Sequence, residues 1–317
     1  MTYSIVARDA TTGDLGVAVQ SRFLAVGAVV PWARAGVGAV ATQAYGHPGY
    51  GRDGLELLAA GSGPDATLER LLRDDPLREE RQAGIVDWRG RAASFTGSAC
   101  YGWAGGRTGS GFAAQGNILA GSAVVDGRAE TFAAGNRPFP ELLVACLAAA
   151  EAAGGDRRGR QSAALLVVRE GGGYGGYTDR WIDLRVDDHA TPIDELARLL
   201  DMHRLYFDRP RAEDLLPIDE ALADELRHLL TRLGSLPAGV RGFEPVETAA
   251  VSGSGRPMVG EPRAGPPGWD DLWQRALLAW MEVQNLEERM VAMGWIDPRV
   301  LSALREHPEI ELGNSTD

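Results

Sequence analysis

The sequence predicts an α+β protein in which helical layers cover sheets, followed by a small all-α C-terminal domain. Strand and helix patterns follow one another along residues 3–205 in the order strands, helices, strands, helices. Strand patterns stop near Asp208, and the segment 234–268 is rich in proline, glycine and serine. Because grouped strands and helices are typical of helical layers packed on sheets, we expect two domains, residues 1–208 and 209–317.

The first half of the chain opens with strands. Apolar residues at 3–7 and 15–20 flank a polar turn and predict a hairpin, and 25–32 and 37–42 are rich in small and β-branched residues. After a glycine- and proline-rich loop, apolar spacing predicts helices at 55–60 and 66–72, the second capped by Asp65. Short apolar runs then predict further strands at 84–88 and 92–96.

The second half begins with an alanine-rich helix at 140–153 and a continuous apolar strand at 163–169. Alternating residues predict a strand at 181–186, and a helical apolar stripe covers 193–205. Beyond the predicted boundary, only helical patterns occur, at 217–233, 269–293 and 298–305. The intervening segment 234–268 lacks apolar periodicity, so we interpret it as a flexible loop or linker.

Composition excludes several classes of function. The formal net charge is -12 and the sequence pI about 5.0, which disfavours binding to nucleic acid. The 32 basic residues are all arginine, so lysine-based chemistry and a lysine-containing phosphate loop are excluded. Cys100 and Cys146 form no metal-binding pair, and we assign neither a metal nor an organic cofactor. Without a long apolar run or a signal-like start, we expect a cytoplasmic protein that does not bind membranes.

The start of the chain supplies a candidate nucleophile. Removal of Met1 would place the amine and the hydroxyl of Thr2 together at the beginning of a strand. An α-amine has a pKa near neutrality and can act as the base for its own hydroxyl. Ser4 is the alternative nucleophile, although it would need cleavage before it or a separate base. The competing interpretation is an ordinary threonine at a terminus.

Further candidates come from polar loops. Asp156, Arg157, Arg160 and Gln161 precede an apolar strand, where a guanidinium could bind a substrate carboxylate; a solvated basic loop explains them equally well. Asn117 is a candidate oxyanion donor or a turn residue with a satisfied amide. His47 lies in the loop 46–51 and is a further substrate-binding candidate, for which an exposed imidazole is the simpler interpretation.

Several blocks of sequence carry a resemblance to a known family. They are the opening residues 2–9, GAVVPWARAGVGAVATQA at 27–44, FTGSAC at 95–100, QGNILAG at 115–121 and GGDRRGRQSAALLVV at 154–168. Over residues 2–207 the chain resembles an uncharacterised bacterial family classed among the N-terminal nucleophile (Ntn) hydrolases. The resemblance implies a four-layer αββα sandwich in which Thr2 is both nucleophile and base. Because the lysine of better-known threonine members is missing, Arg34 or Arg22 would supply the positive field.

The C-terminal region resembles a small helical module described as binding peptidoglycan. A docking or dimerisation element whose tryptophans form its own core is the competing interpretation. We therefore expect an amidohydrolase that cleaves a small, carboxylate-bearing amide through an acyl-threonine. The rival hypothesis is a catalytically silent ligand-binding or scaffold protein with a C-terminal interaction module. Glycine- and alanine-rich surfaces make a homo-oligomer plausible.

Overall fold

The computed structural model describes residues 2–235 and 258–307. The chain divides into two compact units, Met1–Asp201 and Met202–Asp317, each described by itself below. The division falls inside helix α5 (Pro192–Phe207). The expected mixture of sheets and helices with a small C-terminal helical region is confirmed.

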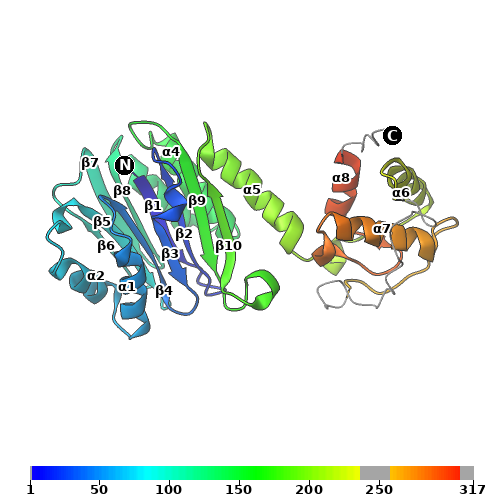
Figure 1. Cartoon of the computed structure of the whole chain (residues 1–317), viewed down its shortest axis with the longest axis horizontal. Helices are drawn as coiled ribbons and strands as arrows, with labels where there is room; N and C mark the ends of the chain where they lie inside the picture. Colours follow the sequence, from blue (N-terminus) through cyan, green and yellow to red (C-terminus); the bar gives the residue numbers. More distant parts are fainter. Residues whose placement is uncertain (1, 236–257, 308–317) are drawn as a thin grey trace, which may run out of the picture. The chain divides into compact units, whose positions relative to one another are not determined.

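Unit 1 contains a six-stranded antiparallel sheet in the order β10-β9-β2-β1-β8-β7 (Figure 1). Its strands are β1 (Thr2–Arg8), β2 (Leu15–Ser21), β7 (Trp103–Gly109), β8 (Phe112–Leu119), β9 (Ser162–Val168) and β10 (Arg180–Val186). The first strand is central because β2 and β8, distant from each other in sequence, pair with its two edges. The first residue of β1 therefore lies between two neighbouring strands of the sheet.

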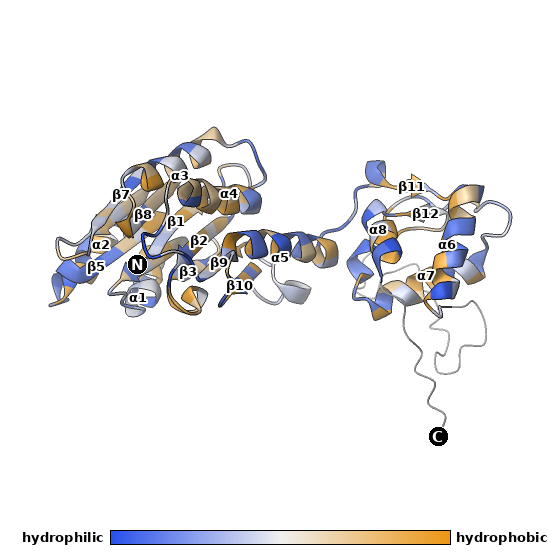
Figure 2. Ribbon diagram, turned by 90° about the horizontal axis from the view of Figure 1, so that it is seen from above, coloured by the Kyte–Doolittle hydropathy of each residue, from blue (hydrophilic) through white to orange (hydrophobic). Residues whose placement is uncertain are grey.

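A second, four-stranded antiparallel sheet has the order β3-β4-β5-β6. Its strands are β3 (Pro31–Arg34), β4 (Gly38–Ala44), β5 (Arg81–Asp87) and β6 (Ala92–Thr96). Helices α1 (Gly49–Ala59) and α2 (Pro64–Arg73) pack on this sheet, and α3 (Ala123–Ala134) and α4 (Phe139–Ala152) pack on the other (Figure 1). In Figure 2, α4 is apolar over most of its length, whereas α5 alternates apolar and polar residues.

Three apolar cores hold these elements together. Val6, Val17 and Ala41 belong to the core between the two sheets. Tyr3 and Ile5, which point to the opposite side of β1, pack with Leu143 and Leu147 of α4 and with residues of α5. The third core joins α1 and α2 to the four-stranded sheet. Side chains thus alternate along β1, so that Thr2, Ser4 and Val6 face the other sheet.

Two segments of unit 1 differ from the expectation. Residues 25–30 contain a short 3-10 helix, Val26–Ala28, instead of a strand, because Ala25 adopts a left-handed φ of 52° and the Ser162 hydroxyl binds the Val26 amide at 3.2 Å. The hairpin β7–β8 and the helix α3 carry no clear sequence pattern and were not expected. The turn interpretation of Asn117 is wrong, because this residue lies in β8.

Unit 2 is mainly helical. Its described residues form helices α6 (Glu220–Arg232), α7 (Asp271–Val283) and α8 (Pro298–Glu306), with short strands β11 (Leu216–Pro217) and β12 (Trp295–Ile296). Each of the three helices begins at an aspartate that accepts a backbone N–H bond, and these caps are Asp219, Asp270 and Asp297. Trp269 and Trp280 are buried in its core.

The expected helix 269–293 is shorter in the structure. Helix α7 ends at Val283, and Asn285 takes a left-handed φ of 58°, which is a common way for a helix to terminate. Most of the expected linker 234–268 and the end of the C-terminal tail lie outside the described residues. Among the helices of the described ranges, none has the length and apolar character needed to span a bilayer.

Candidate functional site

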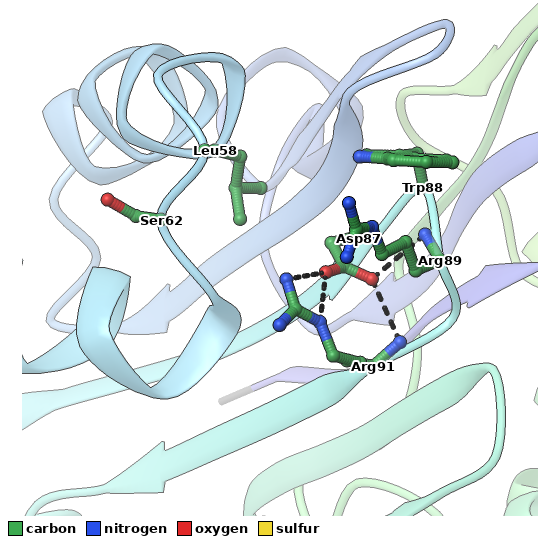
Figure 3. A pocket seen from close by; sticks show the side chains of 7 residues that line it. Leu58, Ser62, Asp87, Trp88, Arg89 and Arg91 are labelled. Atoms are coloured by element: carbon green, nitrogen blue, oxygen red, sulfur yellow. Dashed lines mark hydrogen bonds and ion pairs between the residues drawn. The ribbon is translucent and has the colours of Figure 1, made fainter.

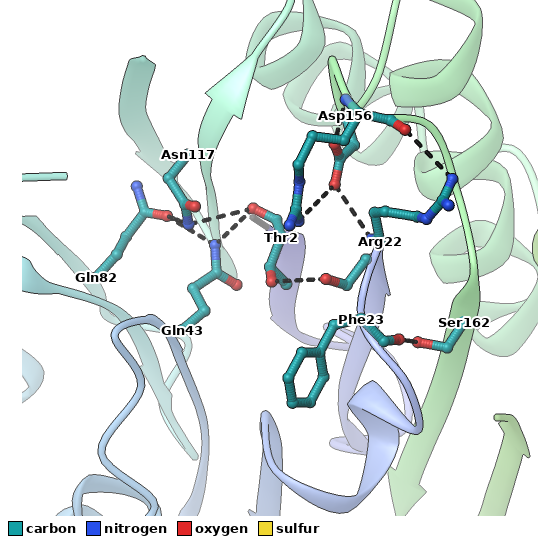
Figure 4. A network of polar contacts seen from close by, with 10 residues as sticks. Thr2, Arg22, Phe23, Gln43, Gln82, Asn117, Asp156 and Ser162 are labelled. Atoms are coloured by element: carbon teal, nitrogen blue, oxygen red, sulfur yellow. Dashed lines mark hydrogen bonds and ion pairs between the residues drawn. The ribbon is translucent and has the colours of Figure 1, made fainter. Parts of the chain in front are cut away.

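Thr2 is the first residue of β1 and lies at one end of the interface between the two sheets. Its cross-strand partners are Ser21 on β2 and Asn117 on β8. The Thr2 hydroxyl is hydrogen-bonded to the Ser21 hydroxyl at 3.0 Å, and the residue is only 6% exposed. Figure 4 shows Thr2 at the centre of a polar network drawn from both sheets. Thr2 is thus held by fixed neighbours rather than placed on a loose end.

Buried amides from both sheets surround Thr2. Gln43 of β4 donates to the Thr2 carbonyl at 3.1 Å and to Gln82 Oε1 at 2.7 Å. Asn117 Nδ2 donates to the same Gln82 oxygen at 2.9 Å and reaches the Thr2 carbonyl at 3.5 Å. The Thr2 carbonyl therefore receives side-chain donors from both sheets (Figure 4).

Ser4 lies deeper in the same interface. Its hydroxyl donates to Gln43 Oε1 at 2.6 Å and accepts from Gln115 Nε2 at 2.7 Å. The residue is fully buried, and neighbouring amides occupy both its donor and its acceptor role. The structure brings Thr2, Ser4 and Asn117 together, but it places Ser4 as a buried link of the network.

On the opposite face of β1, Arg128 of α3 is completely buried. Its NH1 group donates to the carbonyls of Ser4 and Gln115, at 3.0 Å each. Its guanidinium lies 5.1 Å from the centroid of the Tyr3 ring. Burial lowers the pKa of Arg128 to about 10 and raises that of the Tyr3 hydroxyl well above its usual value. Arg128 therefore joins β1 and β8 from beneath the candidate site.

The loop that follows α4 borders the Thr2 end of the sheet. The buried Asp156 carboxylate accepts from the backbone amides of Arg22 at 3.2 Å and Arg158 at 2.8 Å (Figure 4). Its oxygens are turned into the loop, so the structure places Asp156 in a supporting position rather than in contact with solvent. Arg22 is exposed, and its guanidinium donates to the Arg158 carbonyl at 3.4 Å.

The remaining polar residues of this loop differ in whether their side chains are free to bind a substrate. Arg160 forms an ion pair with Glu151 at 3.0 Å, and the Gln161 amide donates to Asp188 at 3.0 Å. Arg157 is exposed and makes no ion pair within the described part of the chain. Of the predicted carboxylate-binding residues, Arg157 is the one whose guanidinium is not already engaged.

Arg34 is not brought to Thr2. It pairs with Gly38 at the start of β4, whereas Gln43, which touches Thr2, lies five residues further along that strand, roughly 17 Å away. Its guanidinium instead forms an ion pair with Glu56 of α1 at 2.5 Å. The expectation that Arg34 provides the positive field at Thr2 is therefore not supported by its position.

His47 lines a different feature. It stacks on Tyr50, with ring centroids 5.0 Å apart, at a cleft of about 490 Å³ beside α1 and α2. A smaller cavity of about 110 Å³ lies near Asp87, whose carboxylate is held by Arg91 at 2.7 Å (Figure 3). Thr2 lines neither of these two cavities. Within residues 2–235 and 258–307, no cluster of three or more metal-binding side chains occurs.

Sequence reasoning missed three members of the network. Ser21, Gln43 and Gln82 are uncharged polar residues at or near the ends of short strands, and each has a polar or charged neighbour in the sequence. Such a residue can face solvent or a second sheet, and its strand pattern is the same in both cases. Their one shared signal is an uncharged hydrogen-bonding side chain near the end of a strand.

Comparisons with known proteins place the chain in a family. Residues 2–196 match the model of a family of unknown function, DUF1028. The chain belongs to this family. The crystal structure of the DUF1028 protein SPO2555 from Silicibacter pomeroyi is 33% identical, with a TM-score of 0.59; the match covers 64% of this chain and 89% of that one.

Residues 263–304 match a second model, described as "Putative peptidoglycan binding domain". No curated protein matched the chain. The resemblance to an uncharacterised family followed by a module of this kind is therefore confirmed. The assignment of DUF1028 to the Ntn hydrolases stays a prediction.

Proposed function

We propose that unit 1 is an Ntn-hydrolase-like αββα sandwich that cleaves a small, carboxylate-bearing amide through an acyl-threonine intermediate. The observation that carries this proposal is the placement of Thr2 at the first position of a central strand, with its hydroxyl 3.0 Å from Ser21 and its carbonyl held from both sheets. The order of helices, sheet, sheet and helices supports it. A fixed nucleophile is what acyl transfer requires.

The chemistry uses groups of Thr2 itself. After removal of Met1, the α-amine takes the proton from Oγ1 while Oγ1 forms a bond to the amide carbonyl carbon. The tetrahedral intermediate collapses as the C–N bond breaks, and the amine-held proton passes to the leaving nitrogen. Water then attacks the acyl-threonine ester, with the same amine as base, and releases the carboxylic acid and free Thr2.

The neighbours of Thr2 take supporting roles in this proposal. Ser21 orients the nucleophilic hydroxyl through the bond that joins their oxygens. Gln43 fixes the backbone of Thr2 through the shorter bond to its carbonyl. Asn117 makes only a long, 3.5 Å contact there, so this N–H can turn to a developing oxyanion at small cost. Gln82 keeps both amides in place by accepting from each.

Charge at the site favours an anionic substrate group. Arg157 and Arg22 are exposed guanidiniums at the Thr2 end of the sheet, and Arg157 is unpaired within the described residues. A guanidinium binds a carboxylate through two parallel N–H bonds. We assign carboxylate recognition to Arg157. Arg160 is the second candidate, and it would first have to leave its ion pair with Glu151.

The test combines mass and turnover. Intact-mass measurement should show loss of one methionine, and a library of carboxylate-bearing amides should yield a substrate whose turnover Thr2→Ala abolishes. Ser4→Ala removes the alternative nucleophile, so turnover that survives Thr2→Ala but is lost in Ser4→Ala would assign the role to Ser4. Retained Met1 with no turnover would favour the silent scaffold instead.

The family match in unit 2 supports a second function, recognition of peptidoglycan by residues 263–304. The full-length chain should sediment with purified sacculi and be released by soluble cell-wall fragments. If the chain stays in the supernatant at all protein concentrations, unit 2 serves instead as a docking or dimerisation element.

A further inference from the structure

Arg128 presents a buried positive charge that the proposed chemistry has not used. It is 0% exposed, and within the described residues no carboxylate lies in ion-pair distance of its guanidinium. Its contacts are the carbonyls of Val124, Ser4 and Gln115, and its NH2 group has no hydrogen-bond partner in that part of the chain. A buried cation without a counter-ion is costly, so it calls for an explanation.

The position of this charge relates it to Thr2. Arg128 binds the carbonyl of Ser4, two residues along β1 from Thr2. At about 3.3 Å per strand residue, its guanidinium lies roughly 10 Å from the Thr2 amine. The intervening space is the packed interior of unit 1, where solvent ions screen a field poorly.

The other charged groups near this end of unit 1 are largely paired. The pairs are Asp156 with Arg158, Glu151 with Arg160, and Asp75 with Arg81. Arg157 and Arg22 are both exposed, and the Arg22 guanidinium is bonded to a carbonyl, so water and salt screen these two charges. Tyr3 and Cys146 lie beside Arg128, and burial raises the pKa of both, so both are neutral at pH 7. Arg128 is therefore the buried charge at this end that nothing compensates among the described residues.

We propose that Arg128 is a positioning residue that pins the strand carrying Thr2 and, through its uncompensated charge, keeps the Thr2 amine unprotonated near neutral pH. This rests on the proposed function, because it assumes that Thr2 becomes the N-terminus. An unprotonated amine is the form that can accept the hydroxyl proton. Arg128 would thus supply the field for which Arg34 is badly placed.

The size of the effect follows from the distance. At roughly 10 Å and an effective dielectric constant of about 20, one positive charge lowers the pKa of an amine by about one unit. The folded protein should therefore show a Thr2 amine that titrates about one pH unit below that of the unfolded chain. Removal of the Arg128 charge should raise the pKa of the Thr2 amine in the folded protein by most of that difference.

The absence of lysine from the sequence makes the measurement direct, because the α-amine is the chain's single primary amine. Protein that begins at Thr2 is prepared by cleaving an N-terminal fusion directly before this residue. The rate of labelling by an amine-selective reagent is followed against pH by intact mass. Turnover is not used, so a failure of the proposed function and a failure of this inference give different results.

Three comparisons decide the outcome. Arg128→Met should raise the labelling midpoint by about one pH unit, and Arg169→Met, at the far end of β9, should leave it unchanged. Cys146→Asp adds a carboxylate beside Arg128 and should also raise the midpoint, which covers the case of a misfolded Arg128→Met. The wild type in urea gives the unperturbed value without any variant. A folded wild-type midpoint equal to or above the urea value, or an unchanged midpoint in the folded variants, would overturn the proposal.

Discussion

Replacement of Gln43 by leucine tests whether the amide network holds Thr2. The Gln43 amide donates to the Thr2 carbonyl at 3.1 Å and accepts from the Ser4 hydroxyl at 2.6 Å. Leucine has a similar size but neither function. The Ser4 hydroxyl then loses its acceptor, and the Thr2 carbonyl keeps only the long contact from Asn117. At about 1–3 kcal/mol for the Ser4 hydroxyl and about 1 kcal/mol for the weakened bonding of the Thr2 carbonyl, we expect a loss of roughly 2–4 kcal/mol.

Gln20→Leu is the matched control. Gln20 lies on β2, is also buried, and neither atom of its amide has a hydrogen-bond partner in the described part of the chain. Removal of a buried amide that makes no hydrogen bond costs little and can stabilise the fold. The two substitutions therefore each remove one buried amide, and only Gln43→Leu removes hydrogen bonds with it.

Hydrogen-exchange mass spectrometry measures the difference locally. With a tenfold change for each 1.4 kcal/mol, amides of β1 should exchange roughly 30- to 700-fold faster in Gln43→Leu than in the wild type. Peptides from unit 2 serve as an internal reference. Equal protection of β1 in Gln43→Leu and Gln20→Leu would refute the conclusion that the network fixes the start of this strand.

Other substitutions test further parts of the structure. Arg81 holds the pKa of the buried Asp75 carboxyl well below its usual range. The Asp75 carboxylate therefore stabilises the fold fully above a pH of about 4, which is its pKa in the unfolded chain. This stabilisation is lost as the pH falls below that value towards the lower pKa of the folded state. Asp75→Asn should therefore cost about 3–5 kcal/mol in urea unfolding at pH 7, and the difference should shrink in acid. Gly84→Ala would place a Cβ 2.1 Å from Gln115 Oε1; we expect a loss of about 1–3 kcal/mol and faster exchange in β8, and unchanged exchange would contradict it. Asp297→Asn breaks a buried ion pair in unit 2 and should lower the melting temperature of that unit while exchange in β1 stays the same.

Residues of the candidate site were readable from the sequence to different degrees. Thr2 and Asn117 could be proposed because their chemistry is distinctive at their positions. That they are cross-strand partners depends on the pairing of β1 with β8, 115 residues apart. The wrong expectation for Arg34 has the same origin. The sequence indicates a strand that contains Arg34, but it does not indicate which end of that strand lies beside Thr2. Strand register is set by the packing of whole sheets.

What the sequence determined by itself is local: apolar spacing and the presence of a threonine that methionine removal would expose. These depend on neighbouring residues, whose geometry is fixed by the backbone. Only the tertiary structure decided that Gln43 and Gln82 face inwards and that Arg128 is buried with no counter-ion among the described residues. An amide or a guanidinium in an isolated strand or helix is satisfied by water. Two sheets and a helix must exclude that water before such groups bind one another, and this exclusion involves residues far apart in the chain.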